Sequence, residues 1–171
     1  TDNGLYYSVQ LQTKFNLSKH PILYKENIWS FAEDNSDNIW VGTYGEGLYQ
    51  LNTKTQSAIK HDILKNVVAS SSRNFIKSLL ADNKNNLWIG TAEWLCKITS
   101  GNKTYFSDNE ILSSTIKKII QDKKDRVWFA GDKGIASYGL NDSAITNYSK
   151  ILEYDMTSAN VLAIDNSDRL W

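Results

Sequence analysis

The sequence predicts an all-β protein of the β-propeller class, present as a fragment of about four blade equivalents. Three observations lead to this prediction: a tryptophan-centred phrase recurs, its copies are spaced like propeller blades, and the composition favours short strands. The phrase reads NIWVGT from Asn38, LWIGT from Leu87 and RVWFAG from Arg126, and a shortened RLW begins at Arg169. This recurrence indicates one structural unit repeated along the chain.

The spacing of the repeated tryptophans sets the size of the unit. They are Trp40, Trp88, Trp128 and Trp171, so 40 to 48 residues separate successive copies. Periods of about 40–50 residues with β-type composition are typical of propellers, in which each repeat forms one four-stranded sheet. Because an indole has a large apolar area to bury, we expect these four residues to fill the core between sheets.

The composition favours short strands joined by tight turns. The 171 residues include six Trp, nine Tyr and five Phe, but one Pro and one Met. Aromatic and β-branched residues favour strands, whereas the many Asn, Asp and Ser residues favour the turns between them. A chain of this length is also long enough for one domain with its own core.

The repeat divides the chain into three whole units flanked by two halves. In sequence order these five pieces span residues 1–17, 27–62, 75–108, 116–149 and 160–171. The first half is expected to supply the last two strands of a preceding blade, because the letters G-L-Y at residues 4–6 recur at residues 47–49. We interpret the sequence as a piece of a longer propeller with further blades. The two halves would either close on each other or complement a second chain in a homodimer.

Each whole unit contains four strand signals in the same order. The first strand is expected at residues 28–33, 76–81, 117–121 and 161–164. A turn opened by an Asp follows, and its carboxylate can accept hydrogen bonds from backbone N–H groups two or three residues on. The second strand is the tryptophan phrase, whose apolar run suits a strand buried on both faces. The third and fourth strands are expected at residues 48–52 and 58–61, 95–99 and 104–107, and 135–140 and 145–148.

Charge and residue usage argue against several classes of function. Lys plus Arg equals Asp plus Glu at 19 each, so no net field attracts nucleic acid or an acidic membrane surface. No apolar run approaches the roughly 20 residues of a membrane span. One cysteine, Cys96, and two histidines, His20 and His61, provide no Cys/His zinc cluster. We expect no nucleic-acid partner, no metal site and no cofactor, and membrane contact through parts outside this chain.

The units resemble a known family, the two-component regulator propeller repeat. The resemblance lies in residues 28–51, 76–98 and 116–138, with partial matches at 4–9 and 161–171, and it consists of the first strand, the turn Asp and the tryptophan phrase. The third segment departs from the pattern with Ala130 and Gly131 where Gly-Thr is usual. The resemblance implies the periplasmic or extracellular sensor domain of a Bacteroides-type hybrid two-component system, with a histidine kinase elsewhere in the protein. It also implies that the domain senses oligosaccharides from polysaccharide breakdown and regulates transcription. The family motif carries no catalytic residues, so we expect no enzymatic activity from this fragment.

The candidate ligand-binding residues lie in the loop after the tryptophan phrase. This loop is expected on the propeller face where ligands commonly bind, and it holds Trp94 where the other units have a glycine. An exposed indole there would stack on the apolar face of an oligosaccharide ring. The alternative is that Trp94 packs over the adjacent blade. The remaining candidates are Glu93, Tyr44, Glu46, Asp132 and Lys133 in the same loops, and Trp29 at the start of the first strand.

Two other interpretations of polar residues remain open, together with two other classes of function. The Asp-led turns have some of the oxygen spacing of calcium loops, but Ile39, Lys84 and Lys124 stand at positions that such loops need for glycine or oxygen ligands. Acidic pairs such as Glu46 with Glu93 suit a glycosidase in residue type alone. The propeller is expected to be a sensor. The first alternative is a purely structural or protein-interaction propeller, and the second is a carbohydrate-active enzyme.

Overall fold

A computed structural model shows a chain built of antiparallel β-sheets. It describes residues 5–9, 12–18, 23, 25–55, 57–63, 74–149 and 157–171, and the backbone alone before residue 23. The first sheet is a hairpin of β1 (Leu5–Val9) and β2 (Gln12–Ser18). This hairpin has the two strands predicted for the first half unit.

Three four-stranded sheets follow, and each uses strands in sequence order, as propeller blades do. The first contains β3 (Ile28–Glu33), β4 (Asn38–Thr43), β5 (Leu48–Asn52) and β6 (Ala58–His61). The second contains β7 (Ile76–Ala81), β8 (Leu87–Thr91), β9 (Leu95–Thr99) and β10 (Asn102–Tyr105). The third contains β11 (Ile116–Gln121), β12 (Arg126–Gly131), β13 (Gly134–Gly139) and β14 (Ile145–Asn147).

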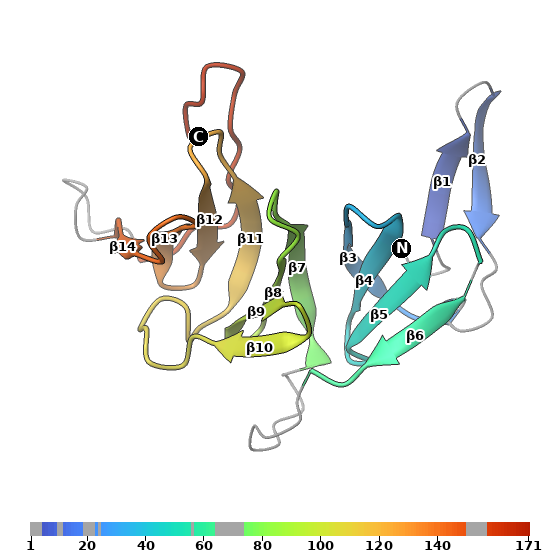
Figure 1. The fold of residues 1–171 in the computed structure, drawn as a ribbon, viewed down its shortest axis with the longest axis horizontal. Helices are drawn as coiled ribbons and strands as arrows, with labels where there is room; N and C mark the ends of the chain where they lie inside the picture. Colours follow the sequence, from blue (N-terminus) through green and yellow to red (C-terminus); the bar gives the residue numbers. More distant parts are fainter. Residues whose placement is uncertain are drawn as a thin grey trace.

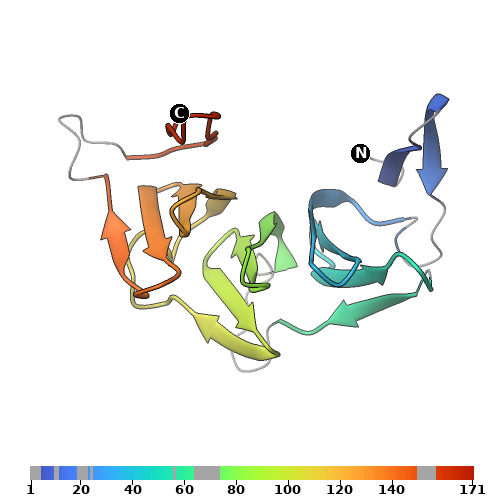
Figure 2. The same ribbon diagram turned by 45° about the horizontal axis from the view of Figure 1, so that its top comes forward.

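The sheets stand side by side along an arc (Figures 1 and 2). The first strands β3, β7 and β11 contact one another on its inner side. The fourth strands β6, β10 and β14 lie on its outer side, as Figure 2 shows. The arrangement is a partial β-propeller, which confirms the predicted fold class.

The strand predictions differ from the structure by one residue at several strand ends of the third unit and by more at two other places. The last strand of the second unit begins at Asn102, two residues earlier than expected, because Ser100 and Gly101 form the tight turn with positive φ angles of 48° and 84°. In the fourth unit, the expected strand at residues 161–164 is reduced to a single bridge between Ile164 and Leu170.

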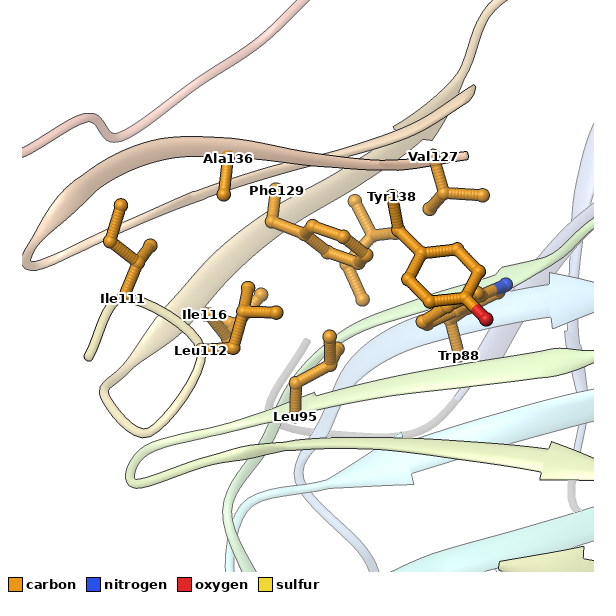
Figure 3. Close-up of a cluster of buried hydrophobic side chains, with 10 residues drawn as sticks. Trp88, Leu95, Ile111, Leu112, Ile116, Val127, Phe129, Ala136 and Tyr138 are labelled. Atoms are coloured by element: carbon orange, nitrogen blue, oxygen red, sulfur yellow. The ribbon is translucent and has the colours of Figure 1, made fainter. Parts of the chain in front are cut away.

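The core lies between neighbouring sheets, and the repeated tryptophans occupy it unequally. Figure 3 shows the cluster between the second and third sheets, in which Trp88 is fully buried and contacts Phe129 and Tyr138 at centroid distances of 5.3 and 5.0 Å. Trp128 is also buried, as expected. Trp171, in contrast, is 69% exposed, which corrects its expected core position.

Trp40 is half-buried and therefore departs in part from the predicted core position. Its ring packs beside the cluster between the first two sheets and lies 4.9 Å from the His61 ring, measured between centroids. A hollow of about 220 Å³ adjoins it between these sheets. This gap leaves part of the Trp40 ring accessible.

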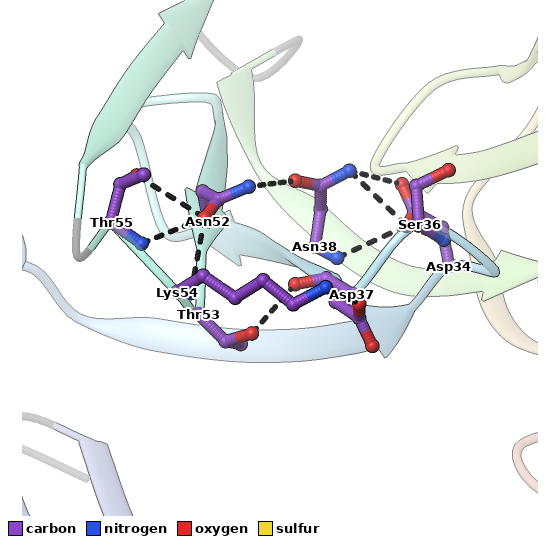
Figure 4. Close-up of polar contacts among 8 residues, drawn as sticks. All are labelled: Asp34, Ser36, Asp37, Asn38, Asn52, Thr53, Lys54 and Thr55. Atoms are coloured by element: carbon purple, nitrogen blue, oxygen red, sulfur yellow. Dashed lines mark hydrogen bonds and ion pairs between the residues drawn. The ribbon is translucent and has the colours of Figure 1, made fainter.

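The Asp-led turns hold the first two strands of every unit together, and Figure 4 shows the turn of the first unit. In the first unit, Asp34 accepts backbone N–H groups from Ser36 at 2.8 Å and Asn38 at 3.1 Å. The acceptor role was predicted, but the second donor lies four residues on instead of three. The Nε1–H group of Trp40 donates to the same carboxylate at 2.9 Å. The turn therefore fixes both the backbone and the repeated tryptophan.

Each turn also binds the turn of the next unit. The backbone N–H of Asn35 donates to the Asn85 side chain at 3.1 Å, and that of Lys123 donates to Asp168 at 3.1 Å. Between the second and third units, the Asn83 side chain donates to Asp125 at 2.6 Å. The three acceptors occupy one turn position with φ near +60°.

Close approach of neighbouring sheets explains the glycine in the tryptophan phrase. The Ser78 hydroxyl on β7 donates to the Ile116 carbonyl of the next sheet at 3.0 Å. A Cβ atom at Gly90 would lie 2.3 Å from that hydroxyl oxygen and 2.8 Å from Ile116 Cβ, which is too close. The third unit has Ala130 at the equivalent position, where the residue paired across the strands is the exposed Lys118 instead of serine. Because no serine side chain stands there, the Cβ atom of Ala130 has space.

Candidate functional site

A β-bulge recurs at the same position in the first strand of every sheet. The pairing register shifts between Ile28 and Ser30 in β3, and at the equivalent places in β7 and β11. Bulges leave one residue outside the ladder and redirect its side chain, and they are common beside functional sites. The bulged residues are Trp29, Lys77 and Lys117, and we call them the bulge row.

Aromatic side chains gather at one end of the bulge row. Trp29 and Tyr44 are in contact at a centroid distance of 4.5 Å, and they are 43% and 46% exposed. Phe75 stacks on Tyr44 at 4.2 Å, and Lys77 Nζ lies 4.4 Å from the centroid of the Trp29 ring. The cation–π contact holds the ammonium group against the indole. The first two sheets thus meet in a partly exposed aromatic cluster with a positive charge beside it.

Polar groups continue the row beyond the aromatic cluster. Lys117 forms an ion pair with Asp132 at 2.6 Å and donates a hydrogen bond to the Asn160 side chain at 2.7 Å. The hydrogen bond from Lys117 lowers the pKa of Asp132, and hydrogen bonding by Thr115 and the charge of Lys77 contribute in the same direction. Asp132 is therefore held in its charged form beside the Lys117 ammonium group.

Trp94 does not supply the exposed stacking surface that its loop position suggested. Its side chain is 6% exposed and packs with Leu48, Ile63 and Cys96 in the core between the first two sheets. Its φ angle is not positive, unlike those of Gly47 and Gly134 at the equivalent loop position. The ring makes an edge contact with Tyr105 at 5.5 Å, and its buried Nε1 has no hydrogen-bond partner. Packing over the adjacent unit, the stated alternative, describes this position.

The other loop candidates do not form one cluster with Trp29 and Tyr44. Glu46 pairs with Lys60 at 2.9 Å. The backbone N–H of Glu93 donates to Thr91 Oγ1 at 3.2 Å, and the side chain is half-buried. Lys133 is exposed, and its carbonyl accepts a hydrogen bond from Ser149. A separate hollow of about 360 Å³ is lined by Glu46, Gly47, Lys60, His61, Asp62, Ile63 and Asn74.

The remaining titratable candidates occupy protected positions. Burial is the main cause that lowers the pKa of His61, and the charge of Lys103 adds to it. His61 is half-buried, and its ring contacts the Trp40 ring. Burial raises the pKa of Cys96 to about 12, which leaves the thiol inert. His20 and most of the two long connections between units lie outside the described residues.

Four residues of this site were not predicted from the sequence: Phe75, Lys77, Lys117 and Asn160. A signal for the two lysines was present, because both stand at the same repeat position as Trp29. The sequence does not reveal the bulge, and a lysine in a regular strand is expected simply to face the solvent. Within the described ranges, no group of three or more His, Cys, Asp and Glu side chains is placed to hold a metal ion.

Comparison with known sequences finds the repeat in two segments. Residues 25–45 and 70–93 match the two-component regulator propeller family, the family that the resemblance indicated. Histidine kinase P4 of Formosa agariphila is 27% identical over 100 residues, which are 54% of this chain and 7% of that protein. The chain therefore spans a small part of this curated relative.

Comparison with solved structures supports the fold over nearly the whole chain. The extracellular domain of BT4673, described as a hybrid two-component system of B. thetaiotaomicron, aligns with a TM-score of 0.74 and 18% identity over 99% of this chain and 22% of its own. That of BT3049 aligns with a TM-score of 0.73 and 18% identity over 98% of this chain and 26% of its own.

An enzyme also shares this fold. Virginiamycin B lyase of Staphylococcus aureus aligns with a TM-score of 0.66 and 13% identity over 98% of this chain and 51% of its own. At such identities the likeness shows the fold alone, and both receptor domains and a lyase have it. In the described part of this chain, no helix has the length and apolar character needed to span a bilayer.

Proposed function

We propose that this chain is part of the extracellular ligand-sensing propeller of a hybrid two-component system, and that it binds oligosaccharides at the bulge row. The proposal rests on the repeat type and on the relatives whose extracellular domains share the fold. The protein would then lie on the periplasmic side of the inner membrane and signal to a histidine kinase that regulates transcription. A homodimer of such receptors would carry the signal across the membrane.

One observation supports the location of the ligand: the exposed contact between Trp29 and Tyr44 on the inner side of the arc. Exposed aromatic rings suit the apolar C–H face of a sugar, and nearby charged groups suit its hydroxyls. Lys77, Lys117 and Asp132 supply such groups beside the rings. Because the side chains come from three consecutive sheets, a ligand across them would also sense the angle between blades.

We further propose that this part of the protein acts without catalysis. Two carboxylates that the loops present, Glu46 and Asp132, are each held by a lysine ammonium group at 2.9 and 2.6 Å. Asp132 is poorly suited to donate a proton as a general acid, since its hydrogen bond with Lys117 lowers its pKa and favours the charged form. Their arrangement suits binding and structural roles.

Calorimetric titration of the full-length protein with a panel of tetrasaccharides tests the proposal. Trp29→Ala is expected to weaken binding of the recognised sugar about tenfold, because it removes one stacking surface. Ile59→Ala is the control, since this exposed residue lies on the outer strand β6. Unchanged affinity in Trp29→Ala, or absence of binding to every sugar, would contradict the proposed site.

A further inference from the structure

The bulge row changes from aromatic to cationic along the arc. One backbone position carries Trp29 in the first sheet, Lys77 in the second and Lys117 in the third. The first two members of the row are in contact, since Lys77 Nζ lies over the Trp29 ring. An indole and two ammonium groups therefore follow one another at the inner side of adjacent blades.

The positive charge of this surface exceeds its negative charge. Lys117 is neutralised by Asp132, with an N–O distance of 2.6 Å. Among the residues that the structure describes, Lys77 makes no ion pair and contacts the indole instead. The formal charge is +1 for the set Trp29, Tyr44, Phe75, Lys77, Lys117, Asp132 and Asn160.

The position of Lys77 prepares its ammonium group for an anionic partner. Contact with the indole restricts the side chain, so less conformational entropy is lost when a ligand binds. A neutral ligand that covered this surface would remove water from the ammonium group without supplying an opposite charge, which is costly. A ligand with an anionic group would restore the lost interaction. The surface therefore discriminates by charge as well as by shape.

We infer that the bulge row binds an acidic saccharide, with its carboxylate or sulfate group on Lys77 and its sugar ring against the exposed parts of Trp29 and Tyr44. This inference rests on the proposed function and narrows the ligand to one chemical class. Carboxylate and sulfate share the chemistry that Lys77 recognises, and separate ligands distinguish them.

Calorimetry of the full-length protein with matched sugars tests the inference. The probes are a tetrasaccharide of galacturonate, the same tetrasaccharide with its carboxylates reduced to alcohols, and a sulfated form of the reduced sugar. The protein is expected to bind at least one anionic form 10–100-fold more tightly than the neutral form, about the effect of one charged hydrogen bond. Lys77→Gln is expected to abolish this preference, and raised salt to reduce it.

Two further variants separate recognition from general charge effects. Lys77→Arg keeps the charge and is expected to retain the preference. Lys118→Gln makes the same change of net charge at an exposed residue of β11 outside the bulge row and is expected to have no effect. Equal binding of neutral and anionic sugars, or an unchanged preference in Lys77→Gln, would overturn the inference. In those cases, a loss of affinity in Trp29→Ala would leave the proposed function standing.

Discussion

The indole Nε1 of Trp88 donates a hydrogen bond of 2.8 Å to the Asp82 carboxylate, and both side chains are buried. The corresponding distance is 2.9 Å for Trp40 with Asp34, 2.8 Å for Trp128 with Asp122, and 3.1 Å for Trp171 with Asp165. Each unit thus joins the turn between its first two strands to its central tryptophan. This hydrogen bond therefore links the polar turn to the apolar core.

Removal of the buried turn carboxylate is expected to destabilise the second unit strongly. Asp82→Ala would leave the Trp88 indole N–H and the backbone and side-chain N–H groups of Asn86 without their acceptor. Unpaired buried donors cost about 1–3 kcal/mol each, so we expect a loss of about 3 kcal/mol or more in the free energy of unfolding. Urea denaturation measures this loss in the free energy of unfolding. The equivalent change in the exposed fourth turn, Asp165→Ala, is the control and is expected to cost less than about 1 kcal/mol.

The burial of Trp94 predicts a large effect on stability instead of on ligand binding. Trp94→Ala would leave a cavity between the first two sheets and is expected to cost about 3–5 kcal/mol. Trp94→Phe should cost much less, because it keeps most of the packing and removes the buried Nε1 that has no partner. Thermal unfolding compares the two variants. A stable Trp94→Ala protein that had lost sugar binding would contradict this assignment.

The Asp122 turn predicts loss of stability in acid. Burial opposes ionisation of this carboxyl, but hydrogen bonds from Trp128, Arg126 and Lys124 outweigh it, so its pKa lies below the ordinary 3.8. The unfolded chain takes up this proton at a higher pH than the folded chain. The stabilisation is therefore complete above about pH 4 and disappears as the pH falls through the folded pKa. Unfolding free energies measured from pH 6 to pH 2.5 should show this decline, and Asp122→Asn should lessen it.

Cys96 is expected to report on opening of the second sheet. Burial raises the pKa of its thiol to about 12, so almost no thiolate exists at pH 8 and the sulfur is covered. Iodoacetamide should leave the native protein unmodified for hours and alkylate it rapidly in urea, as followed by mass spectrometry. Rapid labelling of the native protein would show that β9 opens readily.

The fold was predictable because the same tryptophan phrase recurs at a regular spacing. Trp88 and Trp128 share their phrase, their spacing and their core position, so the repeat alone placed both of them in the core. Trp171 carries the same phrase and is nevertheless exposed, because burial depends on neighbouring side chains that the repeated letters do not specify. The bond between Trp88 and Asp82 was missed, although an Asp precedes each repeated Trp by six residues.

The candidate site was predicted less well, for a geometric reason. Trp94 and Tyr44 both lie in the loop after the tryptophan phrase, yet the side chain of Trp94 is buried and that of Tyr44 is 46% exposed. Which way a loop side chain turns depends on backbone φ and on the packing beneath it. The bulges that redirect Trp29 and Lys77 likewise cannot be recognised from the alternation of apolar and polar residues.

The contacts between successive turns run in one direction along the chain. Each unit gives a hydrogen-bond donor to the unit after it and an acceptor to the unit before it, as with Asn35 to Asn85 and Lys123 to Asp168. A unit inserted by tandem duplication would carry both the donor and the acceptor that join it to its neighbours. The number of blades in such a protein can therefore change at these turns without compensating substitutions.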